Sequence, residues 1–201
     1  MEHIISMEKL PTKYNLSEAV KGLKLATQGL DLLDKKQKIL VMTLGQIHKH
    51  WALAQENLVM AIGHSKALTQ EKILRPVVEA MPSTAKVKVL YTNLAGVPLP
   101  TLTPSLVKHS APPYNLGATT THVDNALVAW QRTAVLLVQL SQWDIQREIV
   151  STQLKKTQKR IGALKNIVIP TYQEKIKHIS NQLEERERDE FVRTKNAIPP
   201  R

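Results

Sequence analysis

An uninterrupted heptad repeat near the start of the chain constrains the fold more than any other feature of the sequence. With Leu16 at position a, the a and d positions up to Leu68 are apolar except for Gln37 and Ser65, and residues 12–75 contain no proline. An apolar spacing of about 3.5 residues over this length predicts a long helix that packs along a coiled-coil seam. The sixteen seam positions are Leu16, Ala19, Leu23, Ala26, Leu30, Leu33, Gln37, Leu40, Leu44, Ile47, Trp51, Ala54, Leu58, Ala61, Ser65 and Leu68.

A second apolar stripe occupies c positions of the same repeat, away from the seam. Its members are Leu25, Leu32, Ile39, Leu53 and Met60. A helix that is apolar on two sides needs contacts on two sides. Either a third element of the same chain covers this stripe or a second protein does. We favour a second protein, because the rest of the chain supplies few elements that could cover it.

The prolines divide the chain into three segments. Of the 11 prolines, seven fall in residues 76–118, which separate two stretches of helical pattern. We therefore expect an N-terminal shaft helix in residues 1–75, a proline-rich insert in residues 76–118 and a C-terminal shaft helix in residues 119–201. Aromatic residues make up only 4% of the chain, so aliphatic side chains must carry the packing. The predicted fold class is all-α: a long antiparallel two-helix coiled coil with a small central β-hairpin.

The insert has the pattern of a small hairpin. The stretch KVKVLY alternates so that Val87, Val89 and Tyr91 share one face; TNLAG then supplies a turn, and VPLPTL follows. Pro98 and Pro100 are two residues apart, so their missing N–H groups would lie on the same edge of the strand. That edge can face outward while the other edge pairs, which also blocks the addition of a further strand.

Two apolar stripes at helical spacing follow the insert, which predicts helices that fold back antiparallel to the first. The second stripe has a mean spacing of about 3.67 residues, so it need not supercoil like a strict heptad repeat. Within it, Pro170 removes a backbone hydrogen bond and predicts a bend near residues 166–171. The first stripe is Val123, Leu127, Trp130, Ala134 and Leu137; the second is Ile161, Leu164, Val168, Tyr172, Ile176, Ile179 and Leu183.

Signatures of catalysis are absent from the sequence. There is no cysteine, and the seven glycines form no loop that could cradle a phosphate. His48 and His50 are two residues apart and would point to different faces of a helix, so we read them as solvated side chains and not as a metal site. Gly22 and Gly29 lie one heptad apart beside the seam, where they either permit close approach of another backbone or are simply tolerated in a long helix.

Two clusters of charged residues can also be explained without a binding or catalytic role. In EERERDE and its surroundings, Glu184 with Arg188, Arg186 with Glu190, and Asp189 with Arg193 are four residues apart and predict ion pairs along a helix face. The run KKTQKR at 155–160 could bind phosphate, but a solvated helix face is favoured because no aromatic residue interleaves it.

The net charge of +11 leaves two classes of partner open. A basic coiled-coil protein could bind nucleic acid or an anionic membrane, and nucleic-acid affinity would then fall steeply with salt. Alternatively, the basic surface faces acidic protein. No run of about 18 apolar residues appears, and MEHIISMEKL lacks the pattern of a signal peptide, so we expect a soluble, intracellular chain.

Both ends of the chain resemble one known family. The stretches PTKYNLSEAVKGLKLATQGLDLLDKK (11–36) and KRIGALKNIVIPTYQEKIKHISNQLEERERDEF (159–191) are similar to the D subunit of V-type (vacuolar, archaeal and bacterial) rotary ATPases, and GVPLP at 96–100 resembles the family's hairpin. Departures from the family's pattern occur at Asp34, Gly162 and Lys165. Matching residues are Lys13, Gly29, Leu32, Leu33, Lys35, Arg160, Ala163, Leu164, Ile169, Pro170, Ile176, Lys177, Ile179, Leu183, Glu184, Glu185, Glu187 and Arg188.

The resemblance implies a central rotor shaft that is not itself an enzyme, binds no cofactor or metal, and couples ATP hydrolysis or synthesis to proton or sodium transport. Its implied partners are the catalytic A and B subunits, the F subunit and the socket subunit above the membrane ring, in a membrane-bound complex on the cytoplasmic side, with no nucleic acid. The helix ends would enter the A and B hexamer. Candidate partner contacts are Lys13, Gly29, Lys35, Val97, Pro98, Arg160, Ile169, Pro170, Glu184, Glu185, Arg186, Glu187 and Arg188.

Overall fold

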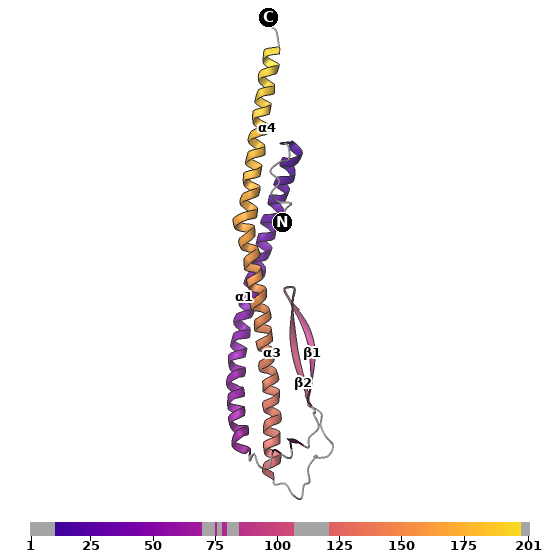
Figure 1. Cartoon of the computed structure of the whole chain (residues 1–201), viewed down its shortest axis with the longest axis vertical. Coiled ribbons are helices and arrows are strands. Elements are labelled where there is room, and N and C mark those ends of the chain that lie inside the picture. The colour runs from indigo at the N-terminus through magenta and orange to yellow at the C-terminus, as the bar shows by residue number, and fades with distance from the viewer. Residues whose placement is uncertain (1–10, 70–74, 76–77, 80–84, 107–120, 198–201) are drawn as a thin grey trace. The chain divides into compact units, whose positions relative to one another are not determined.

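The computed structural model describes residues 11–69, 75, 78–79, 85–106 and 121–197. The predictions concerning MEHIISMEKL and Pro76, Pro82, Pro112 and Pro113 lie outside the described residues. In the chain, long helices precede and follow a two-stranded hairpin, which confirms the predicted all-α class with a hairpin insert (Figure 1). In chain order the elements are α1 (Lys13–Leu68), β1 (Ala85–Leu94), β2 (Val97–Leu106), α3 (Thr121–Ala163), the π-helical turn η2 (Leu164–Val168) and α4 (Ile169–Ala197).

The chain forms two compact units, and α1 and α3 each contribute residues to both. Unit 1 contains residues 1–38 and 155–201, and unit 2 contains residues 39–154. In unit 1, the start of α1 contacts α4, with Lys13 against Glu187 and Gly22 against Tyr172. In unit 2, Ser65 near the end of α1 contacts Thr133 near the start of α3. The helices are therefore antiparallel within each unit.

Local hydrogen bonds explain where α1 begins and ends. The Thr12 side-chain oxygen accepts a hydrogen bond from the Asn15 N–H at 3.2 Å, as an N-cap residue does. At the other end, the Thr69 N–H donates to the Lys66 carbonyl at 3.0 Å, and the Thr69 hydroxyl donates to the Ser65 carbonyl at 2.7 Å. Lys66 in the last turn also suits the negative end of the helix dipole.

The heptad seam of α1 is confirmed, because all sixteen predicted positions are buried or half-buried. In unit 2 the seam builds the main hydrophobic core, where α1 meets α3 and β2. In unit 1 the fully buried members are fewer, with Ala19 on α1 and Ile179 on α4 both 3% exposed. The core of unit 2 consists of Leu40, Ile47, Val97, Leu99 and Val150, with Leu44, Leu94, Trp143, Ile149 and Leu154 packed against it.

The predicted stripe at the start of α3 is only partly right. Val123 is buried in a small cluster that includes Leu127 and Trp130, but Ala134 and Leu137 are exposed. Thr133 occupies the inward position instead, at 5% exposure. Its hydroxyl donates to the Ala129 carbonyl at 2.9 Å and lies 2.8 Å from the Ser65 hydroxyl. A buried hydroxyl is tolerated there because hydrogen bonds satisfy it, and an apolar pattern cannot reveal such a position.

The hairpin turns more tightly than the five-residue stretch TNLAG suggested. β1 and β2 pair antiparallel with Leu94 opposite Val97, which leaves only Ala95 and Gly96 in the turn. Their φ angles are 50° and 76°. Positive φ at both positions matches the two-residue type I′ turn, whose twist suits paired strands. Gly96 adopts this conformation without the steric penalty that Ala95 bears.

The proline-bearing strand β2 is the one that packs on the helices (Figure 1). Leu99 and Pro100 are buried, whereas every β1 residue from Lys86 to Asn93 is exposed. The predicted face of Val87, Val89 and Tyr91 is therefore a solvent-facing surface of the hairpin and forms no part of the core.

The expected disruption by Pro170 is a π-helical turn directly before it. The Ile169 N–H bonds to the Leu164 carbonyl, five residues back. The Thr171 hydroxyl donates to the Ile167 carbonyl at 2.6 Å, which supplies a side-chain partner where the backbone ladder is altered. Insertions of this kind are a recognised way for a helix to accommodate a proline.

Candidate interaction surfaces

The described residues offer no metal-binding cluster. No group of three or more His, Asp or Glu side chains there could hold a metal ion. His48 stacks on Trp51 of its own helix, while His50 stacks on Trp143 of α3, with ring centroids 5.9 Å and 4.9 Å apart. The two histidines thus point to different neighbours, as predicted.

An ionic cluster joins the first turn of α1 to α4 in unit 1. Lys13 Nζ lies 3.0 Å from a carboxylate oxygen of Glu187. The Arg186 guanidinium donates to the Pro11 carbonyl at 3.1 Å. Both side chains of the ion pair are more than half exposed, so the pair adds only a few tenths of a kcal/mol to about 1 kcal/mol. This cluster holds the first turn of α1 against α4.

The charged block on α4 forms only part of its predicted helix-face pairing. Glu184 and Arg188 are 4.0 Å apart, at the limit of an ion pair. Arg186 reaches Pro11 and Glu187 reaches Lys13, both on the other side of unit 1. Glu185 is exposed. Part of the block therefore binds the start of α1, and the rest is an exposed charged surface.

Tyr14, beside this cluster, makes a local contact. Its hydroxyl donates to a Glu18 carboxylate oxygen at 3.0 Å, one helical turn away. This hydrogen bond, together with the negative charge of Glu18, raises the pKa of Tyr14 above its ordinary value.

The two glycines beside the seam of unit 1 have different surroundings. A Cβ atom on Gly22 would lie 2.7 Å from Cε1 of the Tyr172 ring, so the close neighbour is a side chain of the same chain and not another backbone. Nothing lies within 4 Å of a Cβ atom built on Gly29, which therefore borders open space. Lys35 is exposed and pairs with Asp31 at 2.8 Å on the same helix.

The remaining predicted contacts differ in accessibility. Arg160 is exposed, as are the other basic side chains of the run 155–160. This agrees with the prediction of a solvated helix face. Ile169 and Pro170 are half-buried. In the hairpin, Pro98 is exposed, whereas Val97 is 1% exposed and anchors β2 to the core of unit 2.

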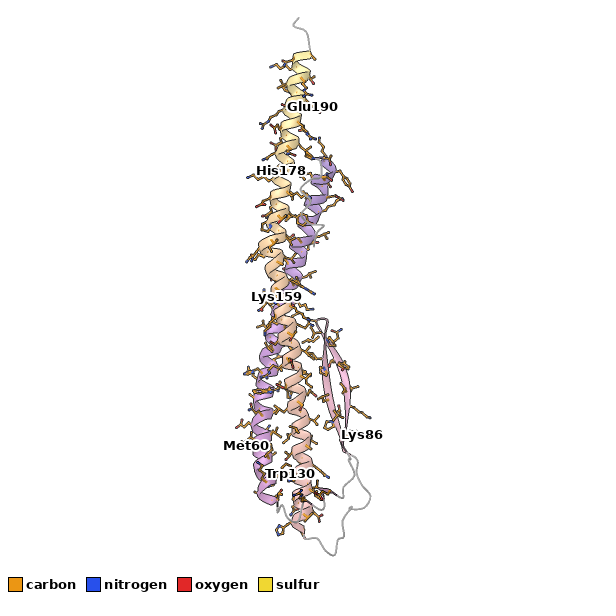
Figure 2. The ribbon with its side chains drawn as sticks, in the orientation of Figure 1. Met60, Lys86, Trp130, Lys159, His178 and Glu190 are labelled. Carbon is orange, nitrogen blue, oxygen red and sulfur yellow. The ribbon has the colours of Figure 1, made fainter. Side chains whose placement is uncertain are left out.

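The second apolar stripe remains uncovered by the described part of the chain. In unit 1, Leu25 and Leu32 are 69% and 66% exposed. In unit 2, Leu53 and Met60 are 57% and 62% exposed, and Figure 2 shows Met60 on the side of α1 away from α3. Among the described elements, therefore, no third element of this chain covers the stripe.

A groove in unit 2 adjoins this stripe. Its volume is about 620 Å³, and it lies between the last turns of α1 and the first turns of α3. Met60, Val128 and Ala129 give it apolar walls, and His64 and Arg132 give it a polar rim.

Sequence reasoning missed two features of unit 2. The Arg147 guanidinium lies 4.5 Å from the centre of the Trp51 ring, a cation–π contact between α3 and α1. Gln142 and Gln146 on α3 bind the backbone of β2. The spacing of the two glutamines, four residues apart, was the available signal. In the described helices, no segment combines the length and apolarity that crossing a bilayer requires.

Taken together, an antiparallel helical pair with a buried seam and a docked hairpin leaves apolar and charged surfaces available for contacts with other proteins. The chain matches the family model for the D subunit of ATP synthases over residues 15–198, and it belongs to that family.

Relatives from several organisms agree with this assignment. The V-type ATP synthase D subunit of Thermotoga neapolitana is 28% identical over 196 residues, which covers 94% of this chain and 96% of the relative. The A-type ATP synthase D subunit of Pyrococcus furiosus is 28% identical over 194 residues, covering 92% and 91%. The V-type D subunit of Clostridioides difficile is 26% identical over 196 residues, covering 91% and 86%. These comparisons lend no support to the nucleic-acid alternative.

Proposed function

We propose that this chain is the central rotor shaft of a V-type or A-type rotary ATPase, and that it carries out no catalysis itself. The observation that carries the proposal is the match to the ATP synthase D subunit along nearly the whole chain, residues 15–198. The helical pair supports it, because a shaft needs stiffness and contact surface more than an active site. The shaft would couple ATP hydrolysis or synthesis in the complex to the transport of protons or sodium ions.

Torque transmission requires that the two helices do not slide along each other. Apolar seams alone resist separation better than sliding, since the hydrophobic effect has no direction. Directional contacts between the helices supply resistance to sliding. In unit 2 these include the Ser65–Thr133 hydrogen bond and the stacking of Arg147 on Trp51. In unit 1 they are the Lys13–Glu187 ion pair and the contact of Tyr172 with Gly22.

We assign the ends of the shaft to the catalytic hexamer of A and B subunits. Unit 1 contains both the start of α1 and the charged end of α4, so these segments would enter the hexamer together. The accessible charges there include those of Glu184, Glu185 and Arg188. The F subunit and the socket subunit would bind unit 2, where Leu53 and Met60 of the uncovered stripe, the groove and the hairpin lie. The complex would place the chain on the cytoplasmic side of the membrane.

A reversible cross-link tests the rotor assignment. The chain has no cysteine, so Glu190→Cys introduces a single thiol on an exposed position of α4 (Figure 2). In the reconstituted complex, a disulfide between this thiol and a cysteine on one of the catalytic subunits should stop ATP hydrolysis, and reduction should restore it. A rotor joined to a stator cannot turn, whereas a static component would tolerate the bond.

A matched control keeps the cross-link inside the shaft. Lys13→Cys with Glu187→Cys, joined by a flexible bismaleimide, links α1 to α4 at the ion pair and forms no covalent bond to a partner. Hydrolysis and ion transport should then continue. Full activity of the Glu190→Cys complex with its disulfide quantitatively formed would contradict the rotor proposal.

A further inference from the structure

The outer edge of β2 is closed to other strands. The register places Pro98, Pro100, Leu102 and Pro104 in one alternating set, opposite Asn93, Tyr91, Val89 and Val87. A residue whose backbone groups point toward β1 must donate an N–H to the ladder, and proline has none. The residues of this set therefore point their backbone groups away from β1. Two α3 side chains bind two of the groups that remain: the Leu102 N–H donates to Gln142 at 2.7 Å, and the Gln146 amide donates to the Pro100 carbonyl at 2.6 Å.

The outer edge of β1 has no such closure. Its outward backbone groups belong to Val87, Val89 and Tyr91, the partners of the outward-facing set on β2. All three side chains are exposed, at 45%, 48% and 71%. No further strand pairs with β1 in the described part of the chain, where the sheet has two strands. Unpaired N–H and C=O groups along an exposed strand are a template for another strand.

The side chains of β1 indicate what kind of strand would fit. Lys86 and Lys88 lie on one face of the hairpin, and Val87 and Val89 lie on the other. Figure 2 shows Lys86 projecting from the hairpin on the side away from the helices. Lysine on an edge discourages neutral or basic strands. An acidic strand would instead gain opposite-charge pairs with both lysines and apolar contacts with both valines.

We propose that β1 accepts an extended, acidic segment of a partner protein as a third strand of this sheet. Main-chain hydrogen bonds to Val87, Val89 and Tyr91 would hold the segment, and Lys86 and Lys88 would select acidic side chains. A second copy of this chain is a poorer occupant, because each copy carries a net charge of +11 and the two would repel. The proposal stands on the hairpin geometry and does not depend on the rotor assignment.

The test uses the full-length protein and a fluorescein-labelled peptide, TEVEVEVT, with TKVKVKVT as its charge-reversed counterpart. Fluorescence anisotropy should detect binding of the acidic peptide and much weaker binding of the basic one. In Lys86→Glu/Lys88→Glu the preference should reverse, with affinity for the acidic peptide falling about tenfold or more. A reversal of preference cannot result from misfolding.

A proline variant tests the backbone edge itself. Val89→Pro removes an outward N–H that the hairpin ladder does not use, as Pro98 and Pro100 already do on β2, so the hairpin should persist. Binding of the acidic peptide should be lost. Val89→Ala keeps the N–H and should weaken binding only about two- to threefold. Circular dichroism and hydrogen exchange of the ladder amides check that each variant folds.

Three results would overturn the proposal. The first is equal binding of the two peptides, or binding that Val89→Pro leaves unchanged. The second is concentration-dependent self-association in ultracentrifugation that Val89→Pro abolishes, since a second copy would then be the occupant. The third is slow hydrogen exchange at the Val87, Val89 and Tyr91 amides of the free protein, which would mean that another part of the chain already covers the edge.

Discussion

The ring of Tyr172 on α4 occupies the space that a side chain on Gly22 of α1 would need, and a Cβ atom on Gly22 would stand 2.7 Å from the ring's Cε1. Gly29 lies one heptad further along α1, and a Cβ atom there would meet nothing within 4 Å. The same residue type thus has two different roles on one helix. Gly22 admits a ring from the facing helix, and Gly29 borders open space.

Alanine at the two glycines should therefore have opposite effects. Gly29→Ala should raise the free energy of unfolding by about 0.5–1 kcal/mol, since alanine favours a helix over glycine. Gly22→Ala should lower it by about 1 kcal/mol because the new methyl group displaces the Tyr172 ring. In a Tyr172→Ala background, Gly22→Ala should become stabilising, a coupling of about 1–2 kcal/mol. Denaturant unfolding measures all the variants. Equal effects of the two alanines in both backgrounds would exclude this role for Gly22.

An aspartate in the seam of α1 should lower the free energy of unfolding far more than an aspartate on the exposed face of the same helix. Leu40 is fully buried, at 0% exposure, whereas Leu32 is 66% exposed. Leu40→Asp buries an unpaired carboxylate and should lower stability by several kcal/mol. Leu32→Asp should change it by less than about 0.5 kcal/mol. Thermal unfolding followed by circular dichroism compares the two. Similar melting temperatures for both variants would show that the seam register is wrong.

The buried hydroxyl pair of unit 2 offers a test of directional contacts. Ser65→Ala removes one partner but leaves the Thr133 hydroxyl bonded to the Ala129 carbonyl, so the expected loss is about 1 kcal/mol. Thr133→Val leaves Ser65 without this partner and should cost about 1–3 kcal/mol. The double variant should cost less than the two losses added together, because neither hydroxyl then lacks a partner. Strict additivity in denaturant unfolding would mean that the hydrogen bond contributes nothing.

Removing residues 182–201 should damage coupling more than it damages partner binding at the hairpin. The cut deletes Arg186 and Glu187, and with them the contacts to Pro11 and Lys13, all in unit 1. Hydrogen exchange should quicken in the first turns of α1. If the rotor assignment is right, the reconstituted complex should retain the F subunit but pump ions weakly. Loss of the F subunit with normal pumping would reverse the assignment of the two units to their partners.

The sequence predicts the helical pair well because one physical signal, apolar spacing, extends over many turns. All the seam positions from Leu16 to Leu68 face inward, including the two polar ones, Gln37 and Ser65. The same signal fails in α3, where Thr133 and Gln146 face inward while Leu137 faces solvent. Hydrogen bonds satisfy these polar groups in the structure, and their partners lie far away in the chain. Hydropathy does not report such partners.

The interaction surfaces show the same contrast between features that apolar spacing predicts and features that depend on tertiary contacts. The uncovered stripe with Leu25 and Leu32 was visible as apolar residues outside the seam, and its exposure is now established for this chain. Which hairpin strand docks was not visible. β1 has the cleaner alternation, yet β2 lies on the core, because its side chains and its backbone both find partners on α3. Pairing of a strand edge with two glutamines depends on tertiary placement and leaves no periodic trace.

The π-helical turn sets the rotational phase of every side chain that follows it. Leu164, Val168, Tyr172 and Ile176 are four residues apart, and in a regular α-helix each such step would drift by about 40°, carrying the stripe away from its partner. The wider turn of η2 absorbs one residue within this run. If the same residues formed a regular α-helix instead, the rest of α4 would be turned by about 100° and Ile179 would leave the seam. The two helices of unit 1 thus stay in step although their residue counts per turn differ, and the wider turn is what keeps the charged end of α4 facing Lys13.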